Sequence, residues 1–143
     1  MKKEKLNFLI PKKENNLGQW LIEQGISAGF PSPADDFKEI RISLDKELVK
    51  NEEASFYARV SGDSMQGAGL ENGDLLIIDR SIEPSNNKIA VCFIDGEFTV
   101  KRIKIESKKI QLIPENKKYS PIKINEENEL IIWGIVTYVI KKL

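Results

Sequence analysis

Short apolar runs and alternating apolar and polar segments, separated by turn residues, follow one another along the chain after Asp35. Valine, isoleucine, threonine and aromatic residues are concentrated in these segments, whereas glycine, asparagine and aspartate stand between them, as is typical of β-strands joined by turns. The pattern predicts at least six strands and a mainly β fold. The predicted strands lie at residues 56–60, 75–79, 89–94, 97–103, 122–124 and 130–140.

The clearest hairpin joins the segments 89–94 and 97–103 through Asp95-Gly96. Asp-Gly is a strong signal for a two-residue turn, because both central positions of that turn need a positive φ. In such a hairpin, directly opposed residues lie on the same face of the sheet. The predicted pairs are Ile94 with Glu97, Cys92 with Thr99 and Ala90 with Lys101.

The first 28 residues differ from the rest, because five of the first thirteen are lysine and no long periodic element is present. We predict a flexible N-terminal arm over residues 1–28 and one domain over residues 29–143. Within the arm, Leu17, Trp20 and Leu21 have the spacing of a short helical turn with one apolar side. Either Trp20 and Leu21 pin the arm to the globular surface, or they serve a specific recognition.

The segment 27–33 combines small residues with two prolines, which hold the backbone extended. A protease cleft accepts an extended segment of small residues as an added strand. The same composition is also typical of an ordinary linker. The segment is therefore interpreted either as a substrate for cleavage or as a plain connection.

Composition narrows the class of protein. With 143 residues, the chain is long enough for one domain with its own core. Lysine and arginine together number 22, as do aspartate and glutamate, so no global field favours nucleic acid or a membrane surface. The N-terminus is not followed by a signal-peptide core, and no apolar run is long enough to span a bilayer. We therefore expect a cytoplasmic protein.

Cys92 is the single cysteine, and the chain contains no histidine. One cysteine allows no internal disulfide, and a zinc site would have almost no ligands. No metal and no cofactor is therefore expected.

The absence of histidine also excludes Ser-His-Asp and Cys-His catalysis, so a hydrolytic serine would need another base. A desolvated lysine amine is the known alternative. Ser64 lies in a glycine-containing turn, and Lys101 lies in the strand predicted opposite Ala90, among small or apolar neighbours. Burial there without a counter-charge should lower the pKa of Lys101 from about 10.4. Ser64 and Lys101 are therefore a candidate Ser-Lys dyad; the alternative is a serine in a common type of turn and a lysine that reaches solvent.

The turn around Ser64 also offers candidate oxyanion donors. Gly62 permits the unusual backbone angles of a tight turn. The backbone N–H groups of Ser64 and Met65 could then point into one small volume, where a developing oxyanion would accept their hydrogen bonds.

Six blocks of the chain resemble, in the same order, the UmuD branch of the LexA family of self-cleaving proteins. Both residues of the candidate dyad lie within them. The blocks are GFPSPA at 29–34, SGDSM at 61–65, NGDLLIID at 72–79, DGEFTVK at 95–101, QLIP at 111–114 and YSPI at 119–122.

The resemblance implies a β-rich domain of the LexA and signal-peptidase type. It also implies that Ser64 is the nucleophile, that Lys101 is the general base, and that the bond between Ala28 and Gly29 is cut. UmuD proteins often carry cysteine before that glycine, so Ala28 is more similar to the LexA version. Its small side chain suits a shallow pocket.

The resemblance further implies partners and a role in the SOS response. A RecA–single-stranded-DNA filament would stimulate cleavage, and the processed homodimer would bind a UmuC-like Y-family polymerase for translesion synthesis. A 28-residue arm is too short for a helix-turn-helix domain with its own core, so sequence-specific DNA binding is not expected. The alternative is a non-enzymatic regulatory interaction module of the same fold.

Overall fold

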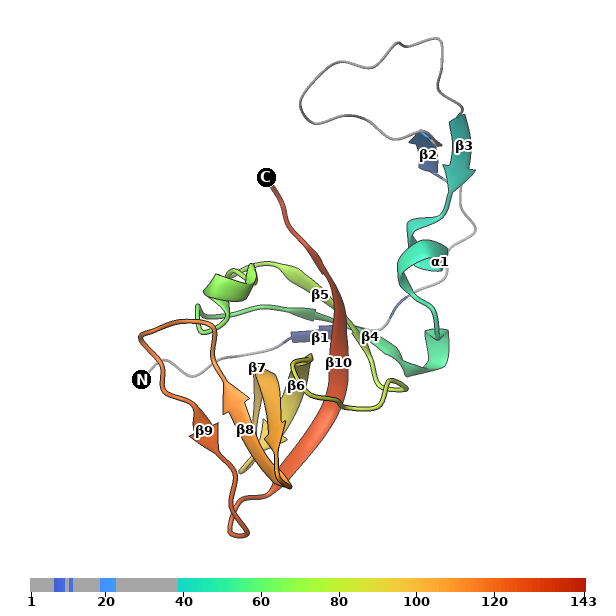
Figure 1. Cartoon of the computed structure of the whole chain (residues 1–143). Coiled ribbons are helices and arrows are strands. Elements are labelled where there is room, and N and C mark those ends of the chain that lie inside the picture. Colours follow the sequence, from blue (N-terminus) through green and yellow to red (C-terminus); the bar gives the residue numbers. More distant parts are fainter. Residues whose placement is uncertain (1–6, 10, 12–18, 23–38) are drawn as a thin grey trace. The chain divides into compact units, whose positions relative to one another are not determined.

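A computed structural model describes residues 7–9, 11, 19–22 and 39–143 of the chain (Figure 1). The chain divides into two compact units. One comprises Met1–Pro11 with Asn51–Leu143, and the other comprises Lys12–Lys50. Each unit is described by itself.

The larger unit contains an antiparallel sheet of eight strands within the described residues, in the order β1-β4-β5-β10-β6-β7-β8-β9. The sequence-based prediction of a mainly β fold is confirmed. Two short 3-10 helices are described in this unit: Glu52–Ala54 precedes β4, and Gln66–Ala68 lies in the connection between β4 and β5. The strands are β1 (Asn7–Leu9), β4 (Ser55–Arg59), β5 (Leu75–Asp79), β6 (Ile89–Ile94), β7 (Glu97–Glu106), β8 (Lys109–Ile113), β9 (Ile122–Lys123) and β10 (Leu130–Ile140).

The predicted hairpin is present as β6 and β7, with the predicted register. Asp95 and Gly96 have φ values of 47° and 84°, which is the backbone that a two-residue hairpin turn requires. Ala90 pairs with Lys101, and Cys92 pairs with Thr99. The turn therefore decides which face of the sheet receives the Lys101 side chain.

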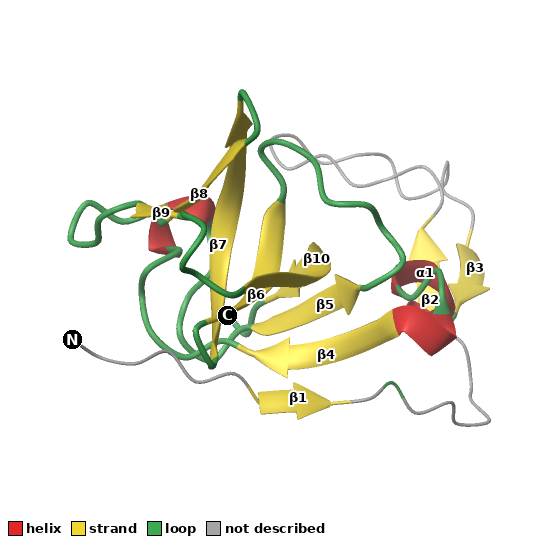
Figure 2. Cartoon of the chain, turned by 90° about the horizontal axis from the view of Figure 1, so that it is seen from below, coloured by secondary structure: helices red, strands yellow, loops and turns green. Residues whose placement is uncertain are grey.

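The sheet buries apolar side chains in two clusters. One cluster contains Val100 of β7, and the other contains Ala90, Cys92 and Ile103, which share the Lys101 face. Both faces of β7 are thus buried near Lys101, and the side chain of Lys101 is only 5% exposed. At the β1 end of the sheet, β4 lies between β1 and β5 (Figure 2).

In the smaller unit, β2 (Gln19–Ile22) pairs antiparallel with β3 (Glu39–Ile42), and the short helix α1 (Leu44–Leu48) follows. The predicted helical turn around Trp20 and Leu21 is therefore wrong. Backbone pairing with β3 satisfies the hydrogen bonds of this segment, and such tertiary pairing outweighs a weak local helical spacing. None of the helices in the described ranges has the length and apolar content that crossing a bilayer requires.

Candidate active site

The structure brings Ser64 and Lys101 together, although 37 positions separate them in the chain. Ser64 lies in the connection between β4 and β5, and Lys101 lies on β7. Lys101 Nζ donates a hydrogen bond to Ser64 Oγ at 3.0 Å, and both residues are buried, with exposed fractions of 5% and 2%. A nucleophile and a base within hydrogen-bond distance, shielded from water, form the arrangement that nucleophilic catalysis needs.

Two neighbours orient the Lys101 amine. Lys101 Nζ lies 2.6 Å from Thr99 Oγ1 and 3.0 Å from the Val100 carbonyl oxygen, and it donates to both. Thr99 precedes Lys101 by two positions, so the strand itself places its hydroxyl on the same face. These contacts hold the amine beside Ser64 through partners that carry no charge.

The first half of the turn that carries Ser64 is fixed by the turn that precedes β5. Gly62 has a φ of 102°, a conformation that favours glycine, and its N–H donates to Asn72 Oδ1 at 3.1 Å. The Gly73 N–H donates to the Val60 carbonyl, and the Val60 N–H donates to the Asp74 carbonyl, both at 2.8 Å. The backbone leading into Ser64 therefore has a defined path.

A second loop, residues 114–119, braces the other half of the turn. Asn116 Nδ2 donates to the Asp63 carbonyl at 2.8 Å, and the Tyr119 hydroxyl donates to Asp63 Oδ1 at 2.5 Å. The Gly67 N–H donates to the Glu115 carbonyl at 2.7 Å. A Cβ on Gly67 would lie 2.5 Å from that carbonyl oxygen, so only glycine fits without a shift of the backbone.

The loop 114–119 is held in turn by β7. Arg102 Nε donates to Glu115 Oε1 at 2.5 Å, and Arg102 Nη1 donates to the Asn87 carbonyl at 2.7 Å. Arg102 directly follows Lys101. One strand thus places both the amine and, through Glu115, the loop that positions Ser64.

Sequence reasoning did not identify these bracing residues, because their partners lie far away along the chain. Tyr119 and Asp63 are 56 positions apart. The sequence signal for Tyr119 is the block at 119–122, which is one of the six that carry the family resemblance.

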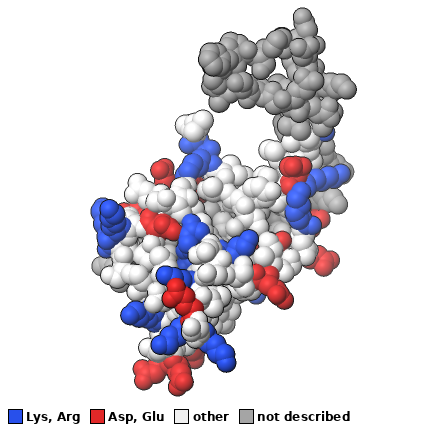
Figure 3. Space-filling model, viewed as in Figure 1, with Lys and Arg blue, Asp and Glu red and all other residues white. Residues whose placement is uncertain are grey.

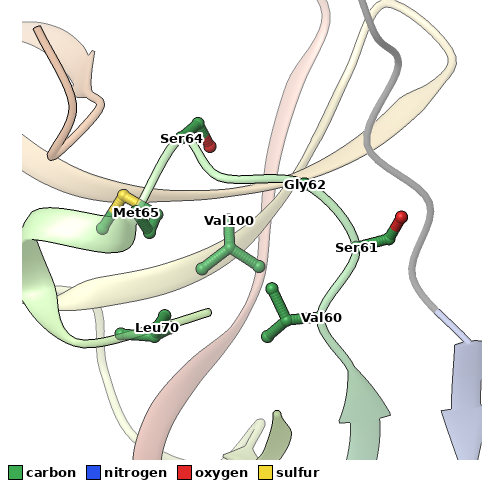
Figure 4. Close-up of a pocket in the computed structure, with 7 residues that line it drawn as sticks. All are labelled: Val60, Ser61, Gly62, Ser64, Met65, Leu70 and Val100. Atoms are coloured by element: carbon green, nitrogen blue, oxygen red, sulfur yellow. The ribbon is translucent and has the colours of Figure 1, made fainter. Parts of the chain in front are cut away.

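A small pocket opens beside Ser64 (Figure 4). Apolar side chains from three parts of the fold form most of its wall, and the Ser64 turn forms its rim. A pocket of this kind suits a small apolar side chain. Its lining residues are Val60, Ser61, Gly62, Ser64, Met65, Leu70 and Val100.

Met65, a candidate oxyanion donor, is buried next to this pocket. Its backbone has φ −114° and ψ 20°, outside both regular helix and strand. Within the described part of the chain, the Met65 N–H makes no hydrogen bond.

Cys92 shares the Lys101 face of the hairpin and is fully buried. Burial raises the pKa of the Cys92 thiol to about 12, although the nearby charge of Lys101 acts in the opposite direction. The thiol stays protonated at neutral pH, so Cys92 does not compete with Ser64 as a nucleophile.

Charged side chains of the described residues are mixed in sign and form no group of metal ligands. On the face seen in Figure 3, basic and acidic side chains of the described residues are interspersed. Among the residues that the structure describes, no three Cys, Asp or Glu side chains are grouped as metal ligands. The predicted cleavage site, Ala28 and Gly29, lies outside the described residues.

Residues 21–137 match the family model of the Peptidase S24-like proteins. The chain belongs to the Peptidase S24-like family. The match covers β4 to β7, and hence both Ser64 and Lys101. Membership supports a serine peptidase of the LexA-like β fold.

Individual relatives cover most of the chain. It is 40% identical to Protein MucA of Salmonella typhimurium over 116 residues, 80% of this chain and 79% of that protein. It is 35% identical to Protein ImpA of Salmonella typhimurium over 133 residues, 92% of this chain and 90% of that protein. It is 38% identical to Protein SamA of Salmonella typhimurium strain LT2 over 122 residues, 85% and 84% of the two chains. These matches confirm the UmuD-like resemblance of the sequence blocks.

Proposed function

We propose that this Peptidase S24-like chain is a serine endopeptidase that cuts itself between Ala28 and Gly29. The observation that carries the proposal is the 3.0 Å contact between Lys101 Nζ and Ser64 Oγ in a buried site. Residues 1–28 would be released as the arm, and residues 29–143 would remain as the processed protein.

In the first half of the reaction, neutral Lys101 takes the proton of the Ser64 hydroxyl while Ser64 Oγ attacks the carbonyl carbon of Ala28. The carbonyl oxygen becomes an oxyanion, which the backbone N–H groups of Ser64 and Met65 would stabilise. The bond to Gly29 then breaks, and the Gly29 amine leaves with the proton from Lys101. An ester between Ser64 and Ala28 remains.

In the second half, Lys101 takes a proton from water, and the resulting hydroxide attacks the ester carbonyl. The ester bond breaks, Ser64 Oγ recovers its proton from Lys101, and Ala28 leaves as a carboxylic acid, which then loses its proton to water. Desolvation favours the neutral amine that both steps require. The neutral partners Thr99 Oγ1 and the Val100 carbonyl orient this amine.

The pocket beside Ser64 supports Ala28 as the residue on the acyl side of the cut. Its wall contains Val60, Leu70 and Val100, which leave room for a methyl group. Gly29 adds no side chain next to the attacked carbonyl.

We further propose a place for this cleavage in the SOS response, on the basis of the UmuD-like resemblance. A RecA–single-stranded-DNA filament would stabilise the arm in the cleft and so raise the population that can react. The processed homodimer would then serve as the accessory subunit of a UmuC-like translesion polymerase. The competing function is a regulatory interaction module that keeps the fold without cleavage.

Intact-mass and N-terminal analysis after incubation with an activated RecA filament separates the two functions. We expect a new N-terminus at Gly29, together with a 28-residue fragment, from the wild-type chain. Ser64→Ala should yield neither product, whereas the exposed Ser85→Ala should behave as wild type. An uncut wild-type chain, or a cut Ser64→Ala chain, would exclude the proposed mechanism.

A further inference from the structure

Strand β1 adds a separate segment of the chain to the edge of the main sheet. It is the first strand in the sheet order, and it pairs antiparallel with β4. Figure 2 shows β1 lying along β4. Without β1, β4 would be the outer strand and would present unpaired backbone groups to another extended segment. The register pairs Asn7 with Arg59, Phe8 with Ala58 and Leu9 with Tyr57.

The side chain of Phe8 attaches β1 to the core. Its ring centroid lies 4.8 Å from that of Trp133 and 4.9 Å from that of Phe98, with the ring planes at 57° and 62°. Aromatic pairs at such distances and angles add stabilisation beyond simple burial. Ala58, which faces Phe8 on β4, is fully buried and small, so the Phe8 ring has room above it.

The rings that receive Phe8 are also held by other contacts. Trp133 packs against Phe56, with centroids 4.9 Å apart, and Arg80 lies 4.6 Å from the centre of its ring. Arg80 Nε also donates to the Trp133 carbonyl at 2.9 Å. Phe98 packs against Phe93 at 4.8 Å. None of these contacts involves Phe8, so they can hold the receiving surface in place when Phe8 leaves, as in a preorganised binding site.

A three-residue strand with one aromatic anchor has little independent stability. A covalent connection of suitable length raises the local concentration of such a segment to the millimolar range, so weak contacts suffice to keep it bound. Cutting that connection would remove this advantage without changing any contact in the site. β1 is thus suited to be a removable strand.

We propose that the β4 edge, together with Trp133 and Phe98, is a binding site for one extended peptide segment with an aromatic residue at its centre. Residues 7–9 occupy it within the intact chain, and the same segment of a released arm binds it from outside. Backbone pairing with β4 supplies affinity, and the space above Ala58 selects the aromatic side chain. The release step alone rests on the proposed function, because it requires the cut between Ala28 and Gly29.

The test uses the full chain with Ser64→Ala, which cannot cut itself, and with Trp20→Phe, which leaves Trp133 as the fluorescent residue. Phe8→Ala is introduced into this background, and a synthetic peptide of residues 2–13 is added. We expect hydrogen exchange of the β4 amides that face β1 to be at least about tenfold faster in the Phe8→Ala chain. The peptide should bind that chain saturably, shift the Trp133 emission and restore the slow exchange.

Two controls define the site. A peptide with Phe8→Ala should not bind, and the chain that retains Phe8 should bind the wild-type peptide at least about tenfold more weakly, because its own strand competes. Phe8→Leu should give intermediate exchange, and it replaces Phe8→Ala if the alanine chain does not fold. Two results would overturn the proposal. One is equal hydrogen exchange of the β4 amides in the chains with and without Phe8, and the other is equal binding of the wild-type and Phe8→Ala peptides. Since no chain in this test can be cut, either result is independent of whether self-cleavage occurs.

Discussion

Lys101 and Lys141 both reach the connection between β4 and β5, but their ammonium groups meet different partners. Lys101 is 5% exposed and donates to Ser64, Thr99 and the Val100 carbonyl. Lys141 follows β10, has a side chain that is 34% exposed, and forms an ion pair with Asp74. Lys141 Nζ also lies 3.9 Å from Glu71 Oε2.

Asp74 shows what a carboxylate partner does. Burial alone would raise its pKa, but hydrogen bonds from Lys141 and from the Glu71 N–H, together with the charge of Lys141, lower the pKa below its ordinary value. Asp74 is thereby held in its charged form. Lys141 is suited to hold the end of β10 at the turn before β5, whereas Lys101 donates to the Thr99 hydroxyl and the Val100 carbonyl, two neutral groups that are compatible with proton transfer.

The same substitution at both lysines gives the sharpest contrast. Lys101→Met should slow self-cleavage by at least about a thousandfold, because methionine fills a similar volume but accepts no proton. Lys141→Met should leave the cleavage rate within about threefold of wild type, since the partners of Lys141 are Asp74 and Glu71 and not Ser64. Gel quantification of the cut chain measures both rates, and Lys104→Met, at an exposed position of β7, is the control. Equal losses of cleavage rate in the two variants would contradict the different roles of Lys101 and Lys141.

Gly67→Ala should disturb the Lys101 region and spare the Lys141 pair. The added Cβ would lie 2.5 Å from the Glu115 carbonyl oxygen, so the turn or the loop 114–119 must move. Overpacking of this kind costs about 1–3 kcal/mol, and we expect that loss in denaturant unfolding together with a severe loss of cleavage. Lys117→Ala, at an exposed position of the same loop, is the matched control. A Gly67→Ala chain with wild-type stability and rate would show that the close contact is not important.

How much of the fold and of the candidate site could be predicted from the sequence depends on whether the interacting residues are close together along the chain. The strands at 75–79 and 130–140 coincide with β5 and β10, because apolar β-branched runs between turn residues mark buried strands. The Asp95-Gly96 turn placed Lys101 opposite Ala90 as observed, because a two-residue loop fixes the register. Patterns among residues close together in the sequence were sufficient to predict these strands and this register.

Other features depended on distant partners. Leu17, Trp20 and Leu21 suggested a helix, but pairing with β3 makes residues 19–22 a strand. Helix α1 (Leu44–Leu48) was not predicted, because five residues give too little helical periodicity, and strand β8 (Lys109–Ile113) was not predicted, because its turn at Ser107 and Lys108 contains no glycine, asparagine or aspartate. The contacts of Asp63 with residues 116 and 119 have no local signature. Of the candidate site, the dyad could therefore be predicted, whereas its bracing could not.

Tyr119→Phe should separate the positioning of Ser64 from its chemistry. It removes the hydroxyl that donates to Asp63 Oδ1 at 2.5 Å, and a lost hydrogen bond of about 1.4 kcal/mol corresponds to a tenfold slower reaction. We expect about that reduction in rate, with an unshifted pH profile because Lys101 is unchanged. Lys118→Ala, on the exposed neighbouring residue, should have no effect. A changed apparent pKa in Tyr119→Phe would mean that Tyr119 acts on the base itself.

Lys141→Met should have the smallest effect, on stability and its pH dependence. Partly exposed ion pairs contribute about 0.2–1 kcal/mol, so a loss of that size is expected near pH 7. Since the folded-state pKa of Asp74 is lowered, the contribution is present above the unfolded value of about 3.9 and is lost as pH falls through the folded pKa. Thermal unfolding from pH 7 to about pH 2 measures the difference between the two chains. A difference that grows towards acid would contradict this assignment.

The most direct test of the central claim is the rate of spontaneous self-cleavage between about pH 6 and 11, for the wild-type chain and Lys101→Arg. A neutral Lys101 that acts as the base predicts a rate that rises with pH and levels off at an apparent pKa below about 10.4. Arginine keeps its charge over this range, so Lys101→Arg should remain inactive throughout. A flat wild-type profile, or an arginine chain that regains cleavage in alkali, would show that deprotonation of Lys101 does not control the reaction.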